Sequence, residues 1–188
     1  MPLIEIAGPA DAEAIAALHA ASWRATYRGI LRDDFLDGGA DQALLKLWGE
    51  RLRDPATVST RWVAKIERAS HLEAFACLFL DVDLEWGAVL DNLHVAPERH
   101  GHGFGRALIA AAAEWVIRQR PDSPLHLWVY EKNVRAIAFY ERLGGRLAGR
   151  KLGTALNGER VDGVRFAWTR PAALVRAARG GSKREAAS

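Results

Sequence analysis

The stretch LDNLHVAPERHGHGFGRAL, residues 90–108, decides how this chain folds. Its pattern predicts a buried strand, a loop that contains Pro97, and an apolar helix that begins among three alternate glycines, Gly101, Gly103 and Gly105. Where a glycine-rich turn leads from a strand directly into a helix, several backbone N–H groups point at one place, at the positive end of the helix dipole. The stretch therefore predicts a binding site for an anion.

The strand in this stretch predicts a β-bulge at Asp91 and Asn92. Apolar residues alternate up to Leu90 and again from Leu93 onward, so the alternation changes phase by one residue. Such a slip turns a strand onto its wrong face unless an extra residue is accommodated. A bulge also frees N–H and C=O groups, which can bind an extended, amide-containing ligand as if it were another strand. A pyrophosphate at the helix start and an amide-bearing arm in a strand gap together describe coenzyme A.

Two motifs resemble those of the GNAT superfamily of N-acetyltransferases. His100, Gly103 and Gly105 stand at the defining places of its pyrophosphate-binding motif, Arg/Gln-x-x-Gly-x-Gly/Ala. The segment EKNVRAIAFYERLG, residues 131–144, resembles its second signature, an Asn followed by a helix that contains Phe-Tyr. The two motifs together are specific. Because the usual Arg or Gln is His100 here, the resemblance leaves open how side chains contribute to phosphate binding.

The resemblance implies an α/β (α+β) fold of the GNAT-like acyl-CoA N-acyltransferase type. Its central sheet is mixed and mostly antiparallel, with a bulged strand splayed from a parallel neighbour and helices on both faces. The strand expected at residues 125–130 follows the bulged strand through a helix, so it should lie parallel to it. A helix is expected at residues 9–27, ended by Gly29. A short turn that starts at Asp33 or Asp34 should follow and be broken by Gly38-Gly39, and Asp41 should then cap a helix at residues 41–52. The remaining strands are expected at residues 3–7, 61–67, 72–80, 85–95, 146–156 and 161–169, and helices at residues 105–119 and 133–143.

The resemblance implies that acetyl-CoA is the co-substrate, and it indicates which residues would contact acetyl-CoA. The backbone of residues 93–95 would pair with the pantetheine arm, and amides freed by the bulge would polarise the thioester carbonyl. Tyr140 matches the tyrosine that family members commonly use as general acid toward the leaving sulfur. The expected cofactor-binding residues are Leu93, His94, Val95, His100, Gly101, His102, Gly103, Phe104, Gly105, Arg106, Asn133 and Tyr140.

The acceptor pocket of this family usually lies beside the first two helices. The resemblance therefore points to Trp23, Tyr27 and Phe35 as substrate-binding residues. Aromatic residues four apart on a helix are equally typical of a hydrophobic core, so that interpretation stays open for Trp23.

The catalytic base is less determined by the sequence. An alkyl ammonium with a pKa around 10.4 must lose a proton before it attacks. Asp91, beside the predicted bulge, is the first candidate, and Glu85, His94, His126 or a water stay open. In the subgroup that resembles ribosomal-protein N-terminal acetyltransferases, a catalytic Glu lies five residues ahead of the Asn. This chain has Trp128 there, which disfavours that subgroup.

We therefore expect an acyltransferase that moves the acetyl group of acetyl-CoA to a primary amine of an unidentified acceptor by direct attack in a ternary complex. Two alternatives stay open: a non-catalytic acyl-CoA-binding module, and an N-terminal or lysine protein acetyltransferase. A Rossmann-type dinucleotide enzyme fits less well, because the glycines are spaced Gly-x-Gly-x-Gly.

Length and charge suggest one domain at residues 1–170 and a basic tail at residues 171–188 that we expect to be disordered. Residues 170–188 carry five basic residues and one acid, a charge of +4, whereas the whole chain of 188 residues carries +3. Residues 1–169 therefore sum to −1, and neither nucleic acid nor a membrane is expected as a partner. The expected partner is a small-molecule or peptide amine, and a homodimer stays open.

The sequence also predicts a cytoplasmic protein without a metal. No secretory leader is recognised, and no run approaches the roughly 20 apolar residues of a membrane span. The single cysteine, Cys77, excludes an intrachain disulfide and is expected in the core. His94, His100 and His102 lack an acid or a Cys placed to complete a tetrahedral metal site.

Overall fold

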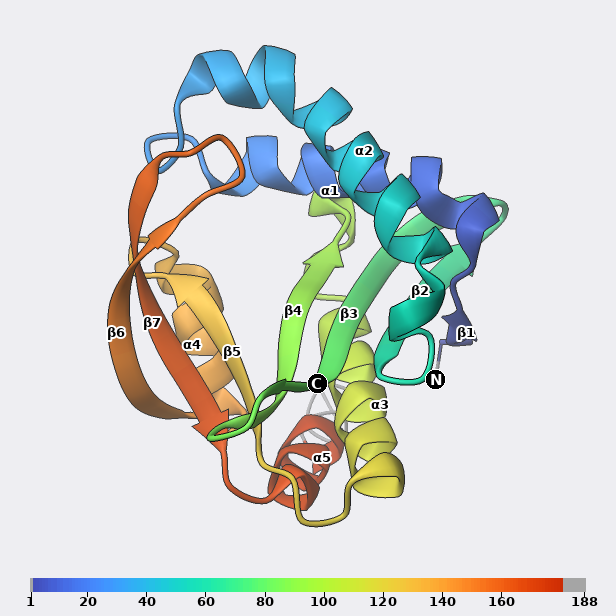
Figure 1. Cartoon of the computed structure of the whole chain (residues 1–188), viewed down its shortest axis with the longest axis vertical. Coiled ribbons are helices and arrows are strands. Elements are labelled where there is room, and N and C mark those ends of the chain that lie inside the picture. The colour runs from blue at the N-terminus through green and yellow to red at the C-terminus, as the bar shows by residue number, and fades with distance from the viewer. Residues whose placement is uncertain (1, 181–188) are drawn as a thin grey trace.

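A computed structural model describes residues 2–180 as a seven-stranded sheet covered by helices on both faces (Figure 1). The sheet has the order β1-β2-β3-β4-β5-β7-β6, and every neighbouring pair is antiparallel except β4 with β5. The strands are β1 (Glu5–Ile6), β2 (Arg61–Arg68), β3 (His71–Asp83), β4 (Gly87–Val95), β5 (Leu125–Tyr130), β6 (Arg146–Thr154) and β7 (Arg160–Trp168). The α-helices are α1 (Ala12–Thr26), α2 (Ala40–Arg53), α3 (Phe104–Gln119), α4 (Val134–Arg142) and α5 (Pro171–Gly180). The expected mixed, mostly antiparallel architecture is confirmed.

Two hydrophobic cores lie on opposite faces of the sheet. Alternate residues of β3 show the division: Ala76 and Leu78 face the core that α3, α4 and α5 cover, whereas Phe75 and Cys77 face the core under α1 and α2. This alternation is the expected pattern for a strand that is buried on both faces. None of the helices in residues 2–180 is both long and apolar enough to cross a membrane.

The predicted bulge in β4 is confirmed. Cys77 of β3 pairs with Asn92 and the next residue, Leu78, pairs with Leu90, which leaves Asp91 as the extra residue. The predicted parallel pairing of β4 with β5 is also confirmed, but it is limited to Ala88 with Leu125 and Val89 with His126. Beyond these pairs the two strands diverge (Figure 1), and their facing edges stay unpaired through the rest of the sheet.

The expected break at Gly38-Gly39 is wrong. Gly38 and Gly39 belong to a π-helix, Phe35–Gly39, which continues directly into α2. Asp41 makes no capping hydrogen bond at the start of α2. Its carboxylate instead receives two hydrogen bonds, of 2.7 and 3.3 Å, from the guanidinium of Arg24 on α1.

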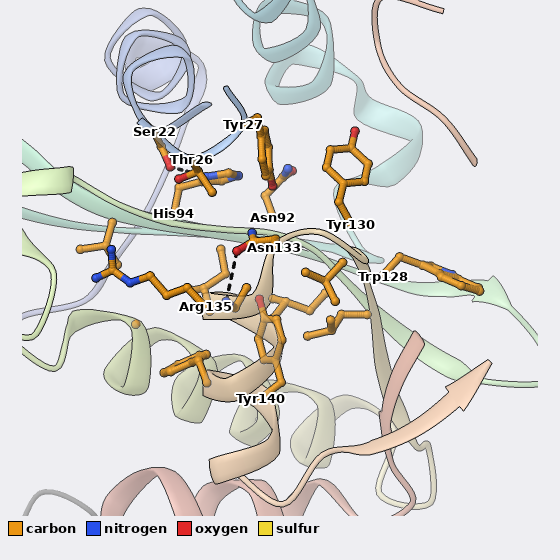
Figure 2. A pocket seen from close by; sticks show the side chains of 18 of the residues that line it. Ser22, Thr26, Tyr27, Asn92, His94, Trp128, Tyr130, Asn133, Arg135 and Tyr140 are labelled. Carbon is orange, nitrogen blue, oxygen red and sulfur yellow. Dashed lines mark hydrogen bonds between the residues drawn. The ribbon is translucent and has the colours of Figure 1, made fainter. Parts of the chain in front are cut away.

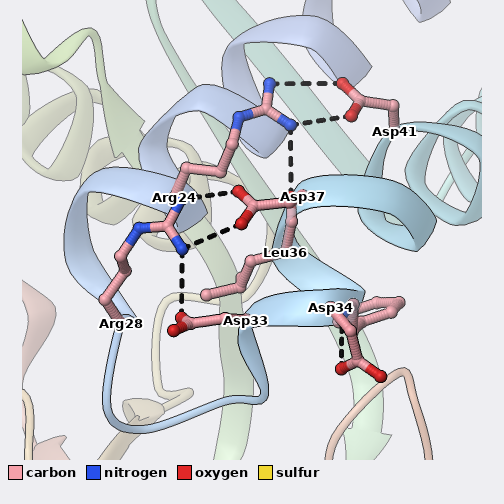
Figure 3. A network of polar contacts seen from close by, with 8 residues as sticks. Arg24, Arg28, Asp33, Asp34, Leu36, Asp37 and Asp41 are labelled. Carbon is pink, nitrogen blue, oxygen red and sulfur yellow. Dashed lines mark hydrogen bonds and ion pairs between the residues drawn. The ribbon is translucent and has the colours of Figure 1, made fainter.

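A second arginine, Arg28, which follows the end of α1, completes this surface network (Figure 3). Arg28 donates to both carboxylate oxygens of Asp37, at 2.5 and 3.1 Å, and to Asp33 at 3.0 Å. Pairs as exposed as these contribute little individually to the free energy of unfolding. Together they fix the π-helix against α1, beside the part of α1 that carries Trp23 and Tyr27.

The expectation of disorder from residue 171 is wrong for residues 171–180, which form α5 and pack on α3 (Figure 1). Leu174 and Ala178 are buried because they recur at helical spacing on one face of an otherwise Ala- and Arg-rich segment. Residues 181–188, the rest of the predicted tail, lie outside the described residues.

Candidate active site

A cavity of about 720 Å³ lies in the gap between β4 and β5. Its lining includes the start of α3, the bulged part of β4, the end of β5, α4, and residues of α1. Figure 2 shows side chains of α1 and β4 on one side of this gap and Tyr140 of α4 on the other. The bulge and the limited pairing of β5 therefore produce an opening that passes through the sheet.

The glycine turn at the start of α3 presents a group of unpaired amides. Gly101 and Gly103 have φ values of +86° and +80°, a left-handed conformation that favours glycine. Among residues 2–180, no acceptor lies within hydrogen-bond distance of the backbone N–H groups of Gly101, Gly103, Phe104, Gly105 and Arg106. At the positive end of a 16-residue helix, these donors suit a pyrophosphate. The turn thus fits the cofactor that its motif implied.

The two histidines of this turn form hydrogen bonds with nearby backbone carbonyls. His100 donates from Nε2 to the carbonyl of Val95 at 3.1 Å, which joins the loop to the end of β4. Burial, assisted by the charge of Arg135, lowers the pKa of His100, so it is neutral at neutral pH. His102 is exposed, donates from Nδ1 to two carbonyls of its own loop, and does not line the cavity, contrary to its expected role. Arg135, which the sequence analysis missed, does line it.

Tyr140 projects its hydroxyl into the cavity from the last turn of α4 (Figure 2). The Asn133 side chain caps this helix by accepting from the amide of Ala136 at 3.1 Å. The Tyr140 ring is 8% exposed and packs edge-on against Trp168. Burial raises the pKa of Tyr140, so its phenol stays protonated and can donate.

Asp91, the predicted base, lines the cavity, but its carboxylate is held by an arginine of α2. Arg51 donates from Nη1 to Asp91 at 2.8 Å and to the side-chain oxygen of Asn92 at 2.7 Å. The guanidinium also lies 4.9 Å from the centre of the Trp48 ring. Arg51 therefore connects α2 to the bulge residue and to its neighbour, a link that the sequence analysis did not foresee.

A buried polar cluster lies where the cavity meets α1. The hydroxyl of Ser22 is 2.9 Å from Nδ1 of His94, and the rings of His94 and His19 have centroids 4.1 Å apart. Trp48 donates from Nε1 to Nδ1 of His19 at 3.0 Å. Neutral His19 therefore carries its proton on Nε2, a buried atom that has no hydrogen-bond partner among the described residues. Burial lowers the pKa of both histidines, that of His94 to about 3.

Aromatic side chains form the wall of the cavity on the α1 side. The Tyr27 ring lies 5.8 Å from the ring of Trp23 and 5.0 Å from that of Tyr130, measured between centroids. Trp23 and Tyr27 line the cavity as expected, and Phe35 does not. Phe35 packs against Trp23 from the π-helix, with centroids 6.2 Å apart, and so supports the wall instead.

The two other candidate bases lie outside the cavity lining. Glu85 is exposed in the turn between β3 and β4, at the opposite end of β4 from the glycine turn. His126 is 2% exposed and donates from Nδ1 to the carbonyl of Trp86 at 3.1 Å. His94 and Asp91 are thus the candidates that the fold brings to the cavity.

The comparisons with known proteins agree with this geometry. Residues 16–145 match the acetyltransferase (GNAT) family. The chain is 29% identical to the probable N-acetyltransferase Rv2775 of Mycobacterium tuberculosis over 78% of this chain and 81% of the relative. It is 31% identical to the uncharacterized N-acetyltransferase YuaI of Bacillus subtilis over 70% of this chain and 72% of the relative.

A solved structure shares the fold. The PaiA N-acetyltransferase of Thermoplasma acidophilum, crystallised in complex with coenzyme A, superposes with a TM-score of 0.69 at 19% identity, over 89% of this chain and 99% of that one. The family match covers more than half of the chain and includes both motifs and most of the residues that line the cavity. The chain therefore belongs to the GNAT family and is an acetyl-CoA-dependent acetyltransferase.

Proposed function

We propose that the protein transfers the acetyl group of acetyl-CoA to the primary amine of a small molecule, by direct attack within a ternary complex. The observation that carries this proposal is the cavity through the sheet, which runs from the unpaired amides of α3 to the aromatic wall beside α1. Cofactor and acceptor then enter from opposite faces and meet at the bulge. Since acetyl-CoA is a cytoplasmic metabolite, we place the reaction in the cytoplasm.

The cofactor's phosphates bind at the start of α3 in this proposal. The amides of residues 103–106 accept the pyrophosphate, and Arg106 and Arg135 add positive charge from the cavity lining. The pantetheine arm lies in the gap between β4 and β5, where the edge of β4 offers the unpaired backbone groups of Leu93 and the amide of Val95, whose carbonyl already accepts from His100. An amide of this edge donates to the thioester oxygen as negative charge develops on it.

Tyr140 is the proposed general acid. Its hydroxyl points into the cavity, and burial holds the phenol protonated. As the tetrahedral intermediate collapses, the C–S bond breaks and Tyr140 donates its proton to the departing thiolate. The phenolate recovers a proton from solvent after the products leave.

His94 is the proposed proton acceptor. The ammonium of the acceptor first loses one proton to solvent. When the N–C bond then forms, the attacking nitrogen becomes positively charged and much more acidic, so a neutral imidazole in contact with it can take the second proton. Burial lowers the pKa of His94 to about 3, which keeps this imidazole neutral before the attack, and the Ser22 hydroxyl, 2.9 Å from Nδ1, orients the ring. Asp91 is the competing candidate, but its carboxylate is already paired with Arg51.

The test is a coenzyme A release assay with a broad panel of amines. We expect Tyr140→Phe to lower kcat by about 10² to 10⁴ while the Kd for acetyl-CoA stays unchanged. Thr169→Val, which removes a hydroxyl from an exposed position outside the cavity lining, serves as the control. His94→Gln should lower kcat more than Asp91→Asn does. Tight acetyl-CoA binding without release of coenzyme A to any amine would instead identify a non-catalytic acyl-CoA-binding module.

A further inference from the structure

The residues that line the cavity carry more positive than negative charge. Among the described residues that line it, Asp91 supplies the only carboxylate, and Arg51 occupies that carboxylate at 2.8 Å. The same lining contains five cationic side chains, which are Arg99, Arg106, Arg135, Arg142 and Lys151. Arg106 and Arg135 lie at the starts of α3 and α4 and serve the cofactor's phosphates in the proposed function. Lys151 lies elsewhere, on β6, and needs a different explanation.

The position of Lys151 follows from the strand register. Lys151 of β6 pairs with Gly163 of β7, and Gly163 pairs in turn with Tyr130 of β5. Directly paired residues of antiparallel strands point to the same face, so Lys151 and Tyr130 share the face that the Tyr27 ring contacts. Two strand spacings separate them, a distance of about 10 Å. A Cβ at Gly163 would meet the Trp128 ring at 3.7 Å, so this ring lies beside the glycine, and Lys151, Gly163 and Tyr130 all line the cavity.

The ammonium group of Lys151 has no acidic partner. Its Nζ lies 4.0 Å from the centre of the Trp128 ring, and it forms no ion pair within residues 2–180. Arg165 also lies over the Trp128 ring, 4.6 Å from its centre. The nearest acid, Asp83, has its carboxylate 3.7 Å from Arg165 and 3.7 Å from His126. The local negative charge is therefore already shared between two other groups.

The surroundings of Lys151 favour an incoming anion. Burial and the neighbouring charge of Arg165 lower the pKa of Lys151, which is the response of a cation without a counter-charge. Nε of Arg165 is buried and has no hydrogen-bond partner among the described residues. A ligand carboxylate in the cavity beside Lys151 would supply the missing counter-charge to Lys151. A second ammonium group in the same place would be repelled by it.

We propose that Lys151 forms a carboxylate-binding subsite where it lines the cavity beside Trp128, and that the acceptor is an amine that also carries a carboxylate. The inference rests on the proposed function and specifies its acceptor class. The carboxylate of the acceptor contacts Lys151, its carbon chain lies along Tyr130 and Tyr27, and its amine points toward His94. Simple diamines and polyamines are then poor acceptors.

The subsite is tested by calorimetry on the protein saturated with coenzyme A, where no transfer takes place. The probes are 5-aminopentanoate, 5-aminopentanamide and 1,5-diaminopentane, which have the same chain length but a negative, neutral or positive end. Shorter and longer ω-amino carboxylates, each with its carboxamide, cover the reach from Lys151 to His94. We expect the best carboxylate to bind the wild type at least tenfold more tightly than its carboxamide, and the diamine to bind most weakly.

Variants identify the residue responsible. Lys151→Met should abolish the preference for the carboxylate, Lys151→Arg should retain it, and Lys46→Met, an exposed lysine on α2, should leave it unchanged. Equal binding of carboxylate and carboxamide to the wild type, or a preference that persists in Lys151→Met, would overturn the subsite. A phosphonate analogue that binds more tightly than the carboxylate would overturn the assigned acceptor class. A weaker Kd for coenzyme A in Lys151→Met would assign Lys151 to the cofactor instead.

The same variants separate this inference from the proposed function. In the release assay with acetyl-CoA, Lys151→Met should lower kcat/KM for amino carboxylates about tenfold or more and leave it unchanged for their carboxamides. If no amine releases coenzyme A but carboxylate binding still depends on Lys151, the proposed function fails and the subsite stands. If amines are acetylated with no dependence on Lys151, the proposed function stands and the subsite fails.

Discussion

His19 of α1 and His94 of the bulged strand β4 lie against each other, with ring centroids 4.1 Å apart. Burial lowers the pKa of both, so two neutral imidazoles meet at the point where the helical layer contacts the cavity. Protonation of either ring places a charge in a site that offers no carboxylate partner to it. The pair therefore links the stability of this layer to pH.

Stability should fall as the pH drops from about 6.5 toward 3. In this window the unfolded chain binds a proton at His94, whose ordinary pKa is 6.5, while the folded protein does not, because its pKa is about 3. The unfolded state then binds more protons, so the free energy of unfolding decreases with falling pH, by at most about 1.4 kcal/mol per unit for this histidine. Urea denaturation across the window should show a shallower slope for His94→Gln. His71→Gln, at an exposed position on β3, is the control, and equal slopes for His94→Gln and wild type would contradict the prediction.

Arg51→Met should weaken acetyl-CoA binding as well as stability. The change removes the donor that holds Asp91 and Asn92, and it leaves the carboxylate of Asp91 without its cation. We expect a loss of about 1–3 kcal/mol in the free energy of unfolding and a several-fold higher Kd for acetyl-CoA. Chemical denaturation and calorimetry measure the two quantities. Arg53→Met, on the exposed side of α2, should alter neither, and an unchanged Kd in Arg51→Met would show that the bulge keeps its shape without Arg51.

Gly145→Ala should destabilise the fold strongly, because its added Cβ has no room. That atom would stand 2.7 Å from the Trp168 ring and 2.9 Å from the carbonyl of Tyr140. We expect a cost of about 1–3 kcal/mol or more by thermal unfolding. At Gly149, on β6, the nearest atom to an added Cβ is 3.9 Å away, so Gly149→Ala should be tolerated. Similar melting temperatures for the two variants would refute this account.

Leu174→Ala should show that α5 belongs to the folded domain. Leu174 is fully buried where α5 packs on α3, so its truncation leaves a cavity. The expected loss is about 2–5 kcal/mol in the free energy of unfolding. Arg176→Ala, on the exposed face of the same helix, should cost less than 1 kcal/mol by the usual behaviour of surface positions. If Leu174→Ala unfolds at the same denaturant concentration as the wild type, α5 contributes nothing to stability.

The sequence predicted the features that local patterns control. The phase change at Asp91 marked the bulge, the alternate glycines marked the turn before α3, and Asn133 marked the start of α4. Each of these depends on backbone conformation within a few residues, so a short stretch carries the information. The positions of Tyr140 and Tyr27 in the cavity lining followed from the same local motifs and from the family they resemble.

The sequence could not predict contacts between distant polar residues. Arg51 reaches Asp91 and Lys151 comes level with Tyr130 only because the sheet register places them there, and nothing beside either residue in the chain marks its partner. Composition also misled the prediction at the C-terminal end, where many arginines concealed the apolar face of α5. The pair Gly38-Gly39 misled it as well, because glycines that usually end a helix here occupy a π-helix held from outside by α1.

The short parallel pairing of β4 with β5 also affects how the protein deforms. In the described sheet, only the two paired positions at the start of β4 and β5 connect strands β1–β4 with strands β5–β7. The two halves of the sheet therefore share a hinge at this end. A thioester arm bound between β4 and β5 would connect the two halves of the sheet along the length of the gap. The rigidity of the enzyme then depends on the bound cofactor as well as on the polypeptide. The complex in which catalysis begins is stiffer than the protein without cofactor.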